Sequence, residues 1–276
     1  MPFDEGFQEV TAQDLREYLR NTPVERYLLV DVRQPVEYAA GHIPGAHLLP
    51  LPELAARRGE LPPEREIVFY CRSGRRSRSA AVFLADSGRR RADIFHLSGG
   101  LLAWNGEQLQ GLPPLRLFDP FGDRALVLYQ GMEVEKGAWR FYRAAGERFV
   151  DTAIAATLRE LEGAEETHAR LLYGFWCQTQ ENPPEFEALY QVLAGELLEG
   201  GASLTELVSR LDAITPADQI QVLEMALDIE LAAYDLYRIL AQRFAGTKLE
   251  GELLLLAQAE KQHLAIAAQA LRKCEV

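Results

Sequence analysis

Three features are scarce in this 276-residue sequence: cysteine, long apolar runs and basic charge. The three cysteines, Cys71, Cys177 and Cys274, are too few and too scattered for a disulfide framework or a four-cysteine metal site. No apolar run approaches the roughly 18 residues that a membrane span needs, and the N-terminus lacks the basic and apolar regions of a signal peptide. We therefore expect a cytoplasmic protein without a membrane partner, in which any sulfur chemistry depends on a single thiol.

The shortage of basic charge is confined to one part of the chain. The net charge of -12 argues against a nucleic-acid partner, because phosphate binding requires surplus lysine and arginine. Residues 1–114 contain 14 arginines, no lysine and 15 acidic residues, whereas residues 115–276 contain 15 basic and 26 acidic residues. Short β-branched runs also give way there to long Leu/Ala/Glu segments with helical periodicity. We predict two domains, 1–114 and 115–276, with a linker at 111–115.

The first domain has the pattern of an α/β fold. Apolar runs at 28–32 and 66–70 are typical of strands that are buried on both faces of a parallel sheet. Helical stretches follow or precede them at 12–20, where Thr11 is the predicted N-cap, and at 77–87. In such sheets, functional side chains gather in the loops that leave the carboxyl ends of the strands.

The loop after strand 66–70 is the candidate site of this domain. Cys71 begins a tight turn that leads into a helix, so successive backbone N–H groups point to one place and form an anion-binding concavity. The helix dipole and the nearby arginines are expected to lower the pKa of Cys71 and make it the nucleophile. The alternative is a buried structural cysteine beside a solvated basic helix start. The residues expected to bind an anionic substrate are Arg72, Ser73, Gly74, Arg75, Arg76 and Ser77.

Several separated motifs in residues 8–112 resemble a single rhodanese domain. They are DVRQPVEY at 31–38, GHIPGA at 41–46, CRSG at 71–74, LSGG at 97–100, and Trp104. The resemblance implies a cysteine that accepts a sulfane sulfur as a persulfide and passes it to a thiophilic acceptor, so the partners are small sulfur compounds. It also implies an internal ion pair between Arg33 and Glu37.

Rhodanese-like sheets also occur in proteins with two other functions. Dual-specificity phosphatases require Cys-x5-Arg to clamp phosphate, but Ser77 occupies that position and Arg76 comes one residue too early. Many rhodanese-type domains lack the cysteine and act only as binding modules. Because Cys71 is present, we expect active sulfur transfer.

The second domain contains an internal duplication. Residues 126–173 match residues 221–268 at a constant offset of 95, which predicts two copies of a helical hairpin. Each glutamate that is repeated between the copies lies about 15 residues, roughly 22 Å, from the turn of its hairpin, so the two glutamates of one hairpin are level across it. Asp151 is the expected cap after the first turn. The matched chemical groups are Glu135 with Glu230, Tyr142 with Tyr237, Glu165 with Glu260, and His168 with His263.

The duplicated residues have the spacing of a metal centre. Glu-x-x-His places its two side chains on one helix face, and the surrounding positions are apolar. Four buried carboxylates are unstable side by side unless cations neutralise them, and two divalent ions would do so. Mixed oxygen and nitrogen ligation suits iron or manganese better than zinc. The alternative is that each Glu-x-x-His lies on a solvated face. The predicted ligands are Glu135, Glu165, His168, Glu230, Glu260 and His263.

This constellation resembles the ferritin-like superfamily, and within it the rubrerythrin family, over residues 122–273. The resemblance implies an all-α four-helix bundle with a di-iron centre, in which manganese or zinc can substitute, and tyrosines 142 and 237 that hydrogen-bond the ligand carboxylates. The additional glutamate of rubrerythrin would fall at Ala233, and no Cys-x-x-Cys rubredoxin domain follows. We therefore expect an external electron donor.

The combined prediction is a rhodanese-type sulfurtransferase fused to a di-iron carboxylate domain. The second domain is expected to reduce peroxide or dioxygen, or to oxidise a sulfur species from the first, and we expect a homodimer. The main alternative is a non-catalytic protein whose bundle stores or senses iron and whose rhodanese domain binds a partner. A bundle held by hydrogen bonds without metal is the third.

Overall fold

The computed structural model describes residues 6–119 and 121–274. It divides into two compact units, one formed by the residues up to Leu112 with Tyr237–Leu254, and the other by Pro113–Leu236 with the residues from Leu255 onward. Among the described residues, no helix combines the length and the apolar character that a membrane crossing requires.

The first part of the chain contains one parallel sheet with strand order β1-β5-β4-β2-β3. The strand predicted at 66–70 is confirmed, and the strand predicted at 28–32 begins and ends one residue earlier. The α/β class of this part is therefore confirmed. The strands are β1 (Gln8–Val10), β2 (Tyr27–Asp31), β3 (His47–Leu48), β4 (Glu66–Tyr70) and β5 (Ile94–Leu97).

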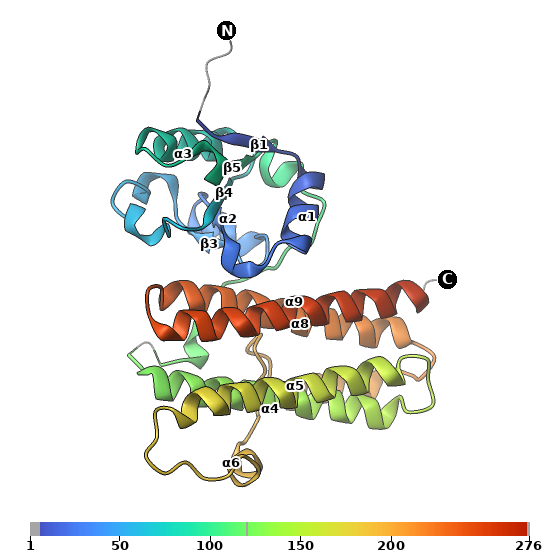
Figure 1. Cartoon of the computed structure of the whole chain (residues 1–276). Helices are drawn as coiled ribbons and strands as arrows, with labels where there is room; N and C mark the ends of the chain where they lie inside the picture. The colour runs from blue at the N-terminus through green and yellow to red at the C-terminus, as the bar shows by residue number, and fades with distance from the viewer. Residues whose placement is uncertain (1–5, 120, 275–276) are drawn as a thin grey trace. The chain divides into compact units, whose positions relative to one another are not determined.

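Helices cover both faces of this sheet (Figure 1). One buried cluster joins Leu15 of α1 and Tyr38 of α2 to Val68 of β4, and a second joins Ala81 of α3 to Phe69 of the same strand. Alternate residues of β4 thus enter different cores, as expected for a strand buried on both faces. The helices are α1 (Ala12–Asn21), α2 (Pro35–Ala40) and α3 (Arg75–Asp86).

The sequence predicted the N-cap of α1 correctly, but it placed the start of α3 too late. The Thr11 side chain accepts a hydrogen bond from the Asp14 N–H at 3.2 Å, so the predicted N-cap of α1 is confirmed. Helix α3 begins at Arg75, two residues before the predicted start. Gly74 is its N-cap with φ of 90°, a left-handed conformation that glycine adopts without strain.

The remainder of the chain is largely helical. Helices α4 and α5 lie side by side as a hairpin (Figure 1). Asp151 does not cap α5, because three further turn residues follow it and Ile154 occupies the N-cap position; that prediction was wrong. The helices are α4 (Arg124–Arg148), α5 (Ala155–Cys177), α6 (Phe186–Val192), α7 (Leu204–Ala213), α8 (Gln219–Arg243) and α9 (Lys248–Cys274).

One apolar core runs through this helical part. It is built from residues of five helices, α4, α5, α7, α8 and α9, so the shorter α7 packs with the four long helices. Members from each, in that order, are Phe141, Leu161, Leu211, Val222 and Ala267.

Candidate functional sites

Cys71 lies immediately after β4, at the mouth of the loop that leads into α3. Its side chain is 1% exposed, and its Sγ accepts a hydrogen bond from the Gly74 N–H at 3.2 Å. Because α3 begins at the next residue, Arg75, the positive end of the helix dipole also faces the sulfur. The structure therefore brings Cys71 to the N–H-lined turn that the sequence predicted.

Hydrogen bonds favour the thiolate form of this cysteine. Burial disfavours a thiolate, but the backbone and side chain of Ser77, together with the backbones of Ser73 and Gly74, donate enough hydrogen bonds to lower the pKa of Cys71. The thiolate is thus stabilised by donors fixed in the loop.

The loop is held in shape by the glycine pair after β5. A Cβ on Gly100 would lie 2.4 Å from the carbonyl oxygen of Cys71, so only glycine permits this approach. The Leu101 N–H donates to the same carbonyl at 2.8 Å, and the Leu102 N–H donates to the Arg72 carbonyl at 3.0 Å. The LSGG motif at 97–100 therefore packs against the backbone of the cysteine loop and stabilises its shape.

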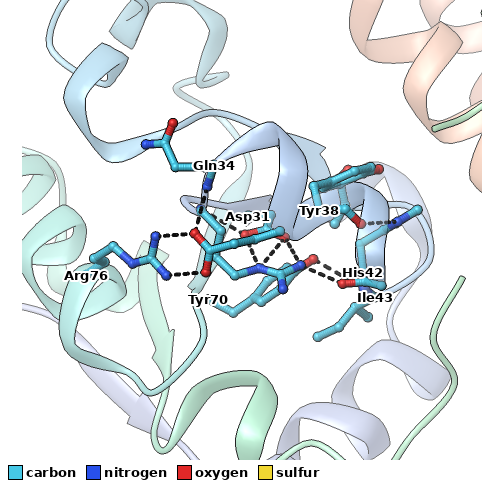
Figure 2. A network of polar contacts seen from close by, with 11 residues as sticks. Asp31, Gln34, Tyr38, His42, Ile43, Tyr70 and Arg76 are labelled. Carbon is cyan, nitrogen blue, oxygen red and sulfur yellow. Dashed lines mark hydrogen bonds and ion pairs between the residues drawn. The ribbon is translucent and has the colours of Figure 1, made fainter. Parts of the chain in front are cut away.

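The arginines of the loop have different surroundings. Arg72 and Arg75 are exposed, whereas Arg76 donates two hydrogen bonds of 2.7 Å to the carboxylate of Glu37. Figure 2 shows Arg76 reaching toward the start of α2 beside Gln34. The hydrogen bonds from Arg76 lower the pKa of Glu37 to about 2. Arg76 therefore links α3 to α2.

The predicted ion pair between Arg33 and Glu37 was wrong. Arg33 instead pairs with Asp31 at 2.6 Å and donates to the Gly41 carbonyl at 2.7 Å. Asp31 ends β2 and lies two residues before Arg33, so its short side chain is within reach of the Arg33 guanidinium. Glu37 takes Arg76 as its partner.

The sequence did not point to His96, which lies close to the loop. His96 is 3% exposed on β5, with Nδ1 3.3 Å from the Ser77 Oγ and Nε2 3.2 Å from a Glu9 carboxylate oxygen. It thus connects Glu9 at the surface to the Ser77 hydroxyl, which donates to the Gly74 carbonyl at 3.1 Å and contributes to the lowered pKa of Cys71. The available signal was a polar residue inside the apolar run 94–97.

In the helical part, the six predicted metal ligands come together. One glutamate comes from each of α4, α5, α8 and α9, and the two histidines come from α5 and α9. Their candidate ligand atoms form three overlapping groups in which all atoms lie within 4.8 Å of one another. The exposed fractions are Glu135 0%, Glu165 2%, His168 4%, Glu230 0%, Glu260 1% and His263 8%.

The two imidazoles connect the carboxylates of this acid cluster. The Nδ1 atom of His168 lies 3.1 Å from a Glu135 oxygen and 2.9 Å from a Glu260 oxygen. The Nδ1 atom of His263 lies 3.3 Å from the other Glu260 oxygen and 3.4 Å from Glu230. The two rings stack with centroids 4.8 Å apart. Glu260 therefore lies between the two histidines.

The pKa values of the cluster are shifted toward retention of protons. Burial and the neighbouring carboxylates raise the pKa of Glu165 well above its usual range and that of Glu230 to about 7. Burial opposes a charged imidazole, yet the facing carboxylates raise the pKa of His263 to about 9 and that of His168 well above its usual range. The cluster thus retains protons in place of other cations.

The two predicted supporting tyrosines are both fully buried. The hydroxyl of Tyr142 donates to a Glu230 oxygen at 2.5 Å, so a residue of the first hairpin holds a carboxylate of the second. Tyr237 occupies the corresponding position on α8.

A fifth buried carboxylate near the cluster was also missed. Glu199, in the segment between α6 and α7, is 1% exposed. Burial and the charges of Glu135, Glu260 and Glu230 raise its pKa well above the usual range. No sequence signal pointed to it, because it lies outside the duplicated hairpins and before two glycines, where an exposed turn is the ordinary expectation.

Known proteins resemble the first part of the chain. A family model described as a rhodanese-like domain matches residues 11–107. A sulfurtransferase from Allochromatium vinosum is 42% identical over 35% of this chain and 86% of its own length. The putative sulfurtransferase YtwF from Bacillus subtilis is 32% identical over 36% of this chain and 92% of its own length. A crystal structure of a rhodanese-related protein from Thermoplasma volcanium is 26% identical, with a TM-score of 0.33 over 37% of this chain and 98% of that one.

These matches are limited to about a third of the chain, and the residues they cover include the Cys71 loop and the glycine pair that supports it. The chain also spans only 41% of the HTH-type transcriptional regulator Rv0324 from Mycobacterium tuberculosis, at 42% identity. Since it covers most of the length of two sulfurtransferases at more than 30% identity, the chain belongs to the rhodanese family through its N-terminal domain.

Proposed function

We propose that Cys71 is the nucleophile of a sulfurtransferase. The observation that carries this proposal is the position of Cys71 in the turn before α3, where its Sγ accepts a hydrogen bond from the Gly74 N–H at 3.2 Å. Hydrogen bonds from Ser77, Ser73 and Gly74 outweigh burial and lower the pKa of the thiol. Relatives of the domain are named sulfurtransferases, which supports the same chemistry. Because the donors converge on the sulfur, they also suit a terminal sulfur or a sulfonate bound next to it.

The reaction proceeds in two displacements. The Cys71 thiolate attacks the sulfane sulfur of a donor such as thiosulfate; an S–S bond forms to Cys71 while the donor S–S bond breaks and sulfite leaves with its electron pair. A thiophilic acceptor such as cyanide then attacks the outer sulfur, so thiocyanate leaves and the thiolate is regenerated. The loop N–H groups neutralise the charge of thiolate and persulfide, and exposed Arg72 and Arg75 are placed to attract the anionic donor.

Replacement of the nucleophile tests this proposal. Cys71→Ser should abolish thiosulfate:cyanide sulfur transfer and leave metal content unchanged, whereas Cys177→Ser, at the end of α5, should retain both. Sulfur transfer by Cys71→Ser at the wild-type rate would exclude the assignment.

We propose separately that residues 115–276 form a ferritin-like four-helix bundle that binds two iron ions. The donor set supports this proposal, because four carboxylates and two imidazoles with mixed oxygen and nitrogen atoms match the ligands that iron prefers. Glu230 Oε2 is buried and forms no well-aligned hydrogen bond with a described residue; the Nδ1 atom of His263 lies 3.4 Å from it. The cluster therefore has both the charge and the open ligand positions that two cations would use.

The residues would have different roles at such a centre. Glu135, Glu165, His168 and Glu260 would hold one ion, and Glu165, Glu230, Glu260 and His263 would hold the other. Tyr142 orients Glu230 through its hydroxyl. When bound, two iron ions supply the redox chemistry for reduction of peroxide or dioxygen, with electrons from an external donor.

Metal analysis tests the second proposal. Protein purified without chelator should contain about two iron ions per chain, and peroxide should be consumed in the steady state when an electron donor is added. Much less than two metals per chain would exclude the centre. Iron without turnover would favour the alternative of iron storage or sensing with a partner-binding rhodanese domain.

A further inference from the structure

The side chain of Glu199 is buried without compensation. It is 1% exposed, and no other described residue donates a hydrogen bond to either of its carboxylate oxygens. A buried carboxylate without a partner is strongly unfavourable, so it is retained where a cation or a proton compensates it. The position of Glu199 in the fold indicates whether a cation or a proton compensates its charge.

The segment that carries Glu199 is fixed closely against α4. A Cβ on Gly137 would lie 2.2 Å from the carbonyl oxygen of Leu197, so only glycine at 137 allows the backbone to lie there. The Gly195 N–H donates to a Glu133 carboxylate oxygen at 2.9 Å, and the guanidinium of Arg140 donates to the Ala194 carbonyl at 2.6 Å. These contacts leave the segment little freedom to move along α4.

The same segment approaches α8 on its other side. A Cβ on Gly200 would lie 3.2 Å from the Cβ of Ala232, which is two residues after the predicted ligand Glu230. Gly137 is likewise two residues after the predicted ligand Glu135. Glu199 therefore enters the helical part between α4 and α8, at the level of the acid cluster.

A tight turn places Glu199 at its tip. The Gly201 N–H donates to the Leu198 carbonyl at 2.8 Å, and the Leu198 N–H donates to the Ala202 carbonyl at 3.0 Å. Leu198 belongs to the core cluster that includes Ala138 and Tyr142, which are three and seven residues after Glu135 and share its helix face. The turn thus inserts its Leu198 side chain into the core of the helical part.

We propose that Glu199 supplies a fifth buried carboxylate beside the proposed metal centre, outside the groups of ligand atoms that lie within 4.8 Å of one another, and stabilises the oxidised metal pair. This inference rests on the metal centre proposed above. Four carboxylates balance two divalent ions, but oxidation adds positive charge that the four do not neutralise. A fifth carboxylate held by an anchored turn supplies the missing negative charge.

Comparison of two metals separates this role from general metal binding. Metal-free wild-type protein and Glu199→Gln are loaded with Zn²⁺ or with iron, and the competing chelator needed to remove each metal is measured, together with the iron reduction potential. Glu199→Gln should still bind about two Zn²⁺, lose affinity for oxidised iron by about tenfold, and have a more positive potential. Glu196→Gln is the matched control, because this exposed carboxylate lies three residues earlier in the same segment.

The outcomes distinguish the two proposals. Wild-type protein that binds neither metal would overturn the metal centre itself. Wild-type protein that binds two irons, with a Glu199→Gln variant of unchanged potential and unchanged affinity for oxidised iron, would overturn only the role of Glu199. A positive shift in Glu199→Gln and none in Glu196→Gln would support it. Circular dichroism and a Zn²⁺ content equal to wild type show that the variant is folded.

Discussion

The Cys71 loop and the acid cluster both place negative charge in the protein interior, but they stabilise it by different means. At Cys71 a single charge meets backbone N–H groups and the Ser77 hydroxyl, and the pKa of the thiol falls. In the acid cluster several carboxylates face one another, and the pKa values of Glu165 and Glu230 rise. Fixed dipoles therefore suffice for one charge, whereas a group of charges requires cations or protons.

The difference also determines what each site exchanges. Dipoles of the loop remain in place while the sulfur changes from thiolate to persulfide, so the site needs no added ion. In the cluster the facing carboxylates raise the pKa of His168 and His263, so a cation at the proposed centre would compete with protons. Removal of one carboxylate from the cluster is therefore expected to change metal affinity more than removal of one hydrogen-bond donor changes sulfur transfer at Cys71.

The largest effect is expected from removal of one carboxylate of the cluster. Glu165→Gln removes a carboxylate whose residue is only 2% exposed. The affinity for zinc and for iron should each fall by about a hundredfold, and the metal content should fall below two ions per chain. Glu166→Gln is the control, because Glu166 is the next residue and pairs with Arg170 at the surface. Elemental analysis after dialysis compares the two. Equal metal content in both variants would contradict a role for Glu165 as ligand.

A smaller effect is expected where the backbone, not a charge, is altered. Gly137→Ala puts a Cβ 2.2 Å from the Leu197 carbonyl and should lower the free energy of unfolding by about 1–3 kcal/mol. Gly163→Ala is the control: nothing lies within 4 Å of its Cβ, so this exposed position on α5 should gain up to about 1 kcal/mol. Chemical denaturation measures both. If both variants had a higher free energy of unfolding than wild type, the segment before α7 would not lie against α4 at Gly137.

The dipole mechanism at Cys71 is tested by its pH profile. Sulfur transfer needs the thiolate, so activity is present above the pKa of Cys71 and is lost as pH falls through it. Ser77→Ala removes the hydroxyl donor but keeps the backbone donor, so the acid limb should move to higher pH and the rate at neutral pH should fall by less than about tenfold. An acid limb at the wild-type position would show that the hydroxyl does not stabilise the thiolate.

The smallest effect is expected from the loop arginines. Arg75→Gln removes an exposed charge near the donor site and should raise the KM for thiosulfate by about two- to fivefold, with a weaker effect at high salt. Arg76→Gln breaks the contact with Glu37 and should change KM less. Steady-state kinetics at two ionic strengths measure both. A larger KM effect from Arg76 would show that its guanidinium leaves Glu37 to bind the donor.

Local patterns in the sequence predicted much of the fold. The strand at 66–70, the Thr11 cap and the α/β class follow from short-range rules of apolar patterning and capping, and the structure contains them. The offset of 95 brought the six cluster residues into register because helices convert sequence spacing into a regular rise. Where a turn of several residues intervenes, as between Asp151 and Ile154, the pattern gave the wrong cap.

The sequence by itself determined that Cys71 begins a strand-to-helix turn and that four glutamates and two histidines share one level of the helical part. These follow from spacing within single elements. Only the tertiary structure decided that Arg76 pairs with Glu37, that His96 reaches Ser77, and that Glu199 enters the core between α4 and α8. The physical reason is that these contacts join segments far apart in the chain, and their partners depend on close packing that no local pattern encodes.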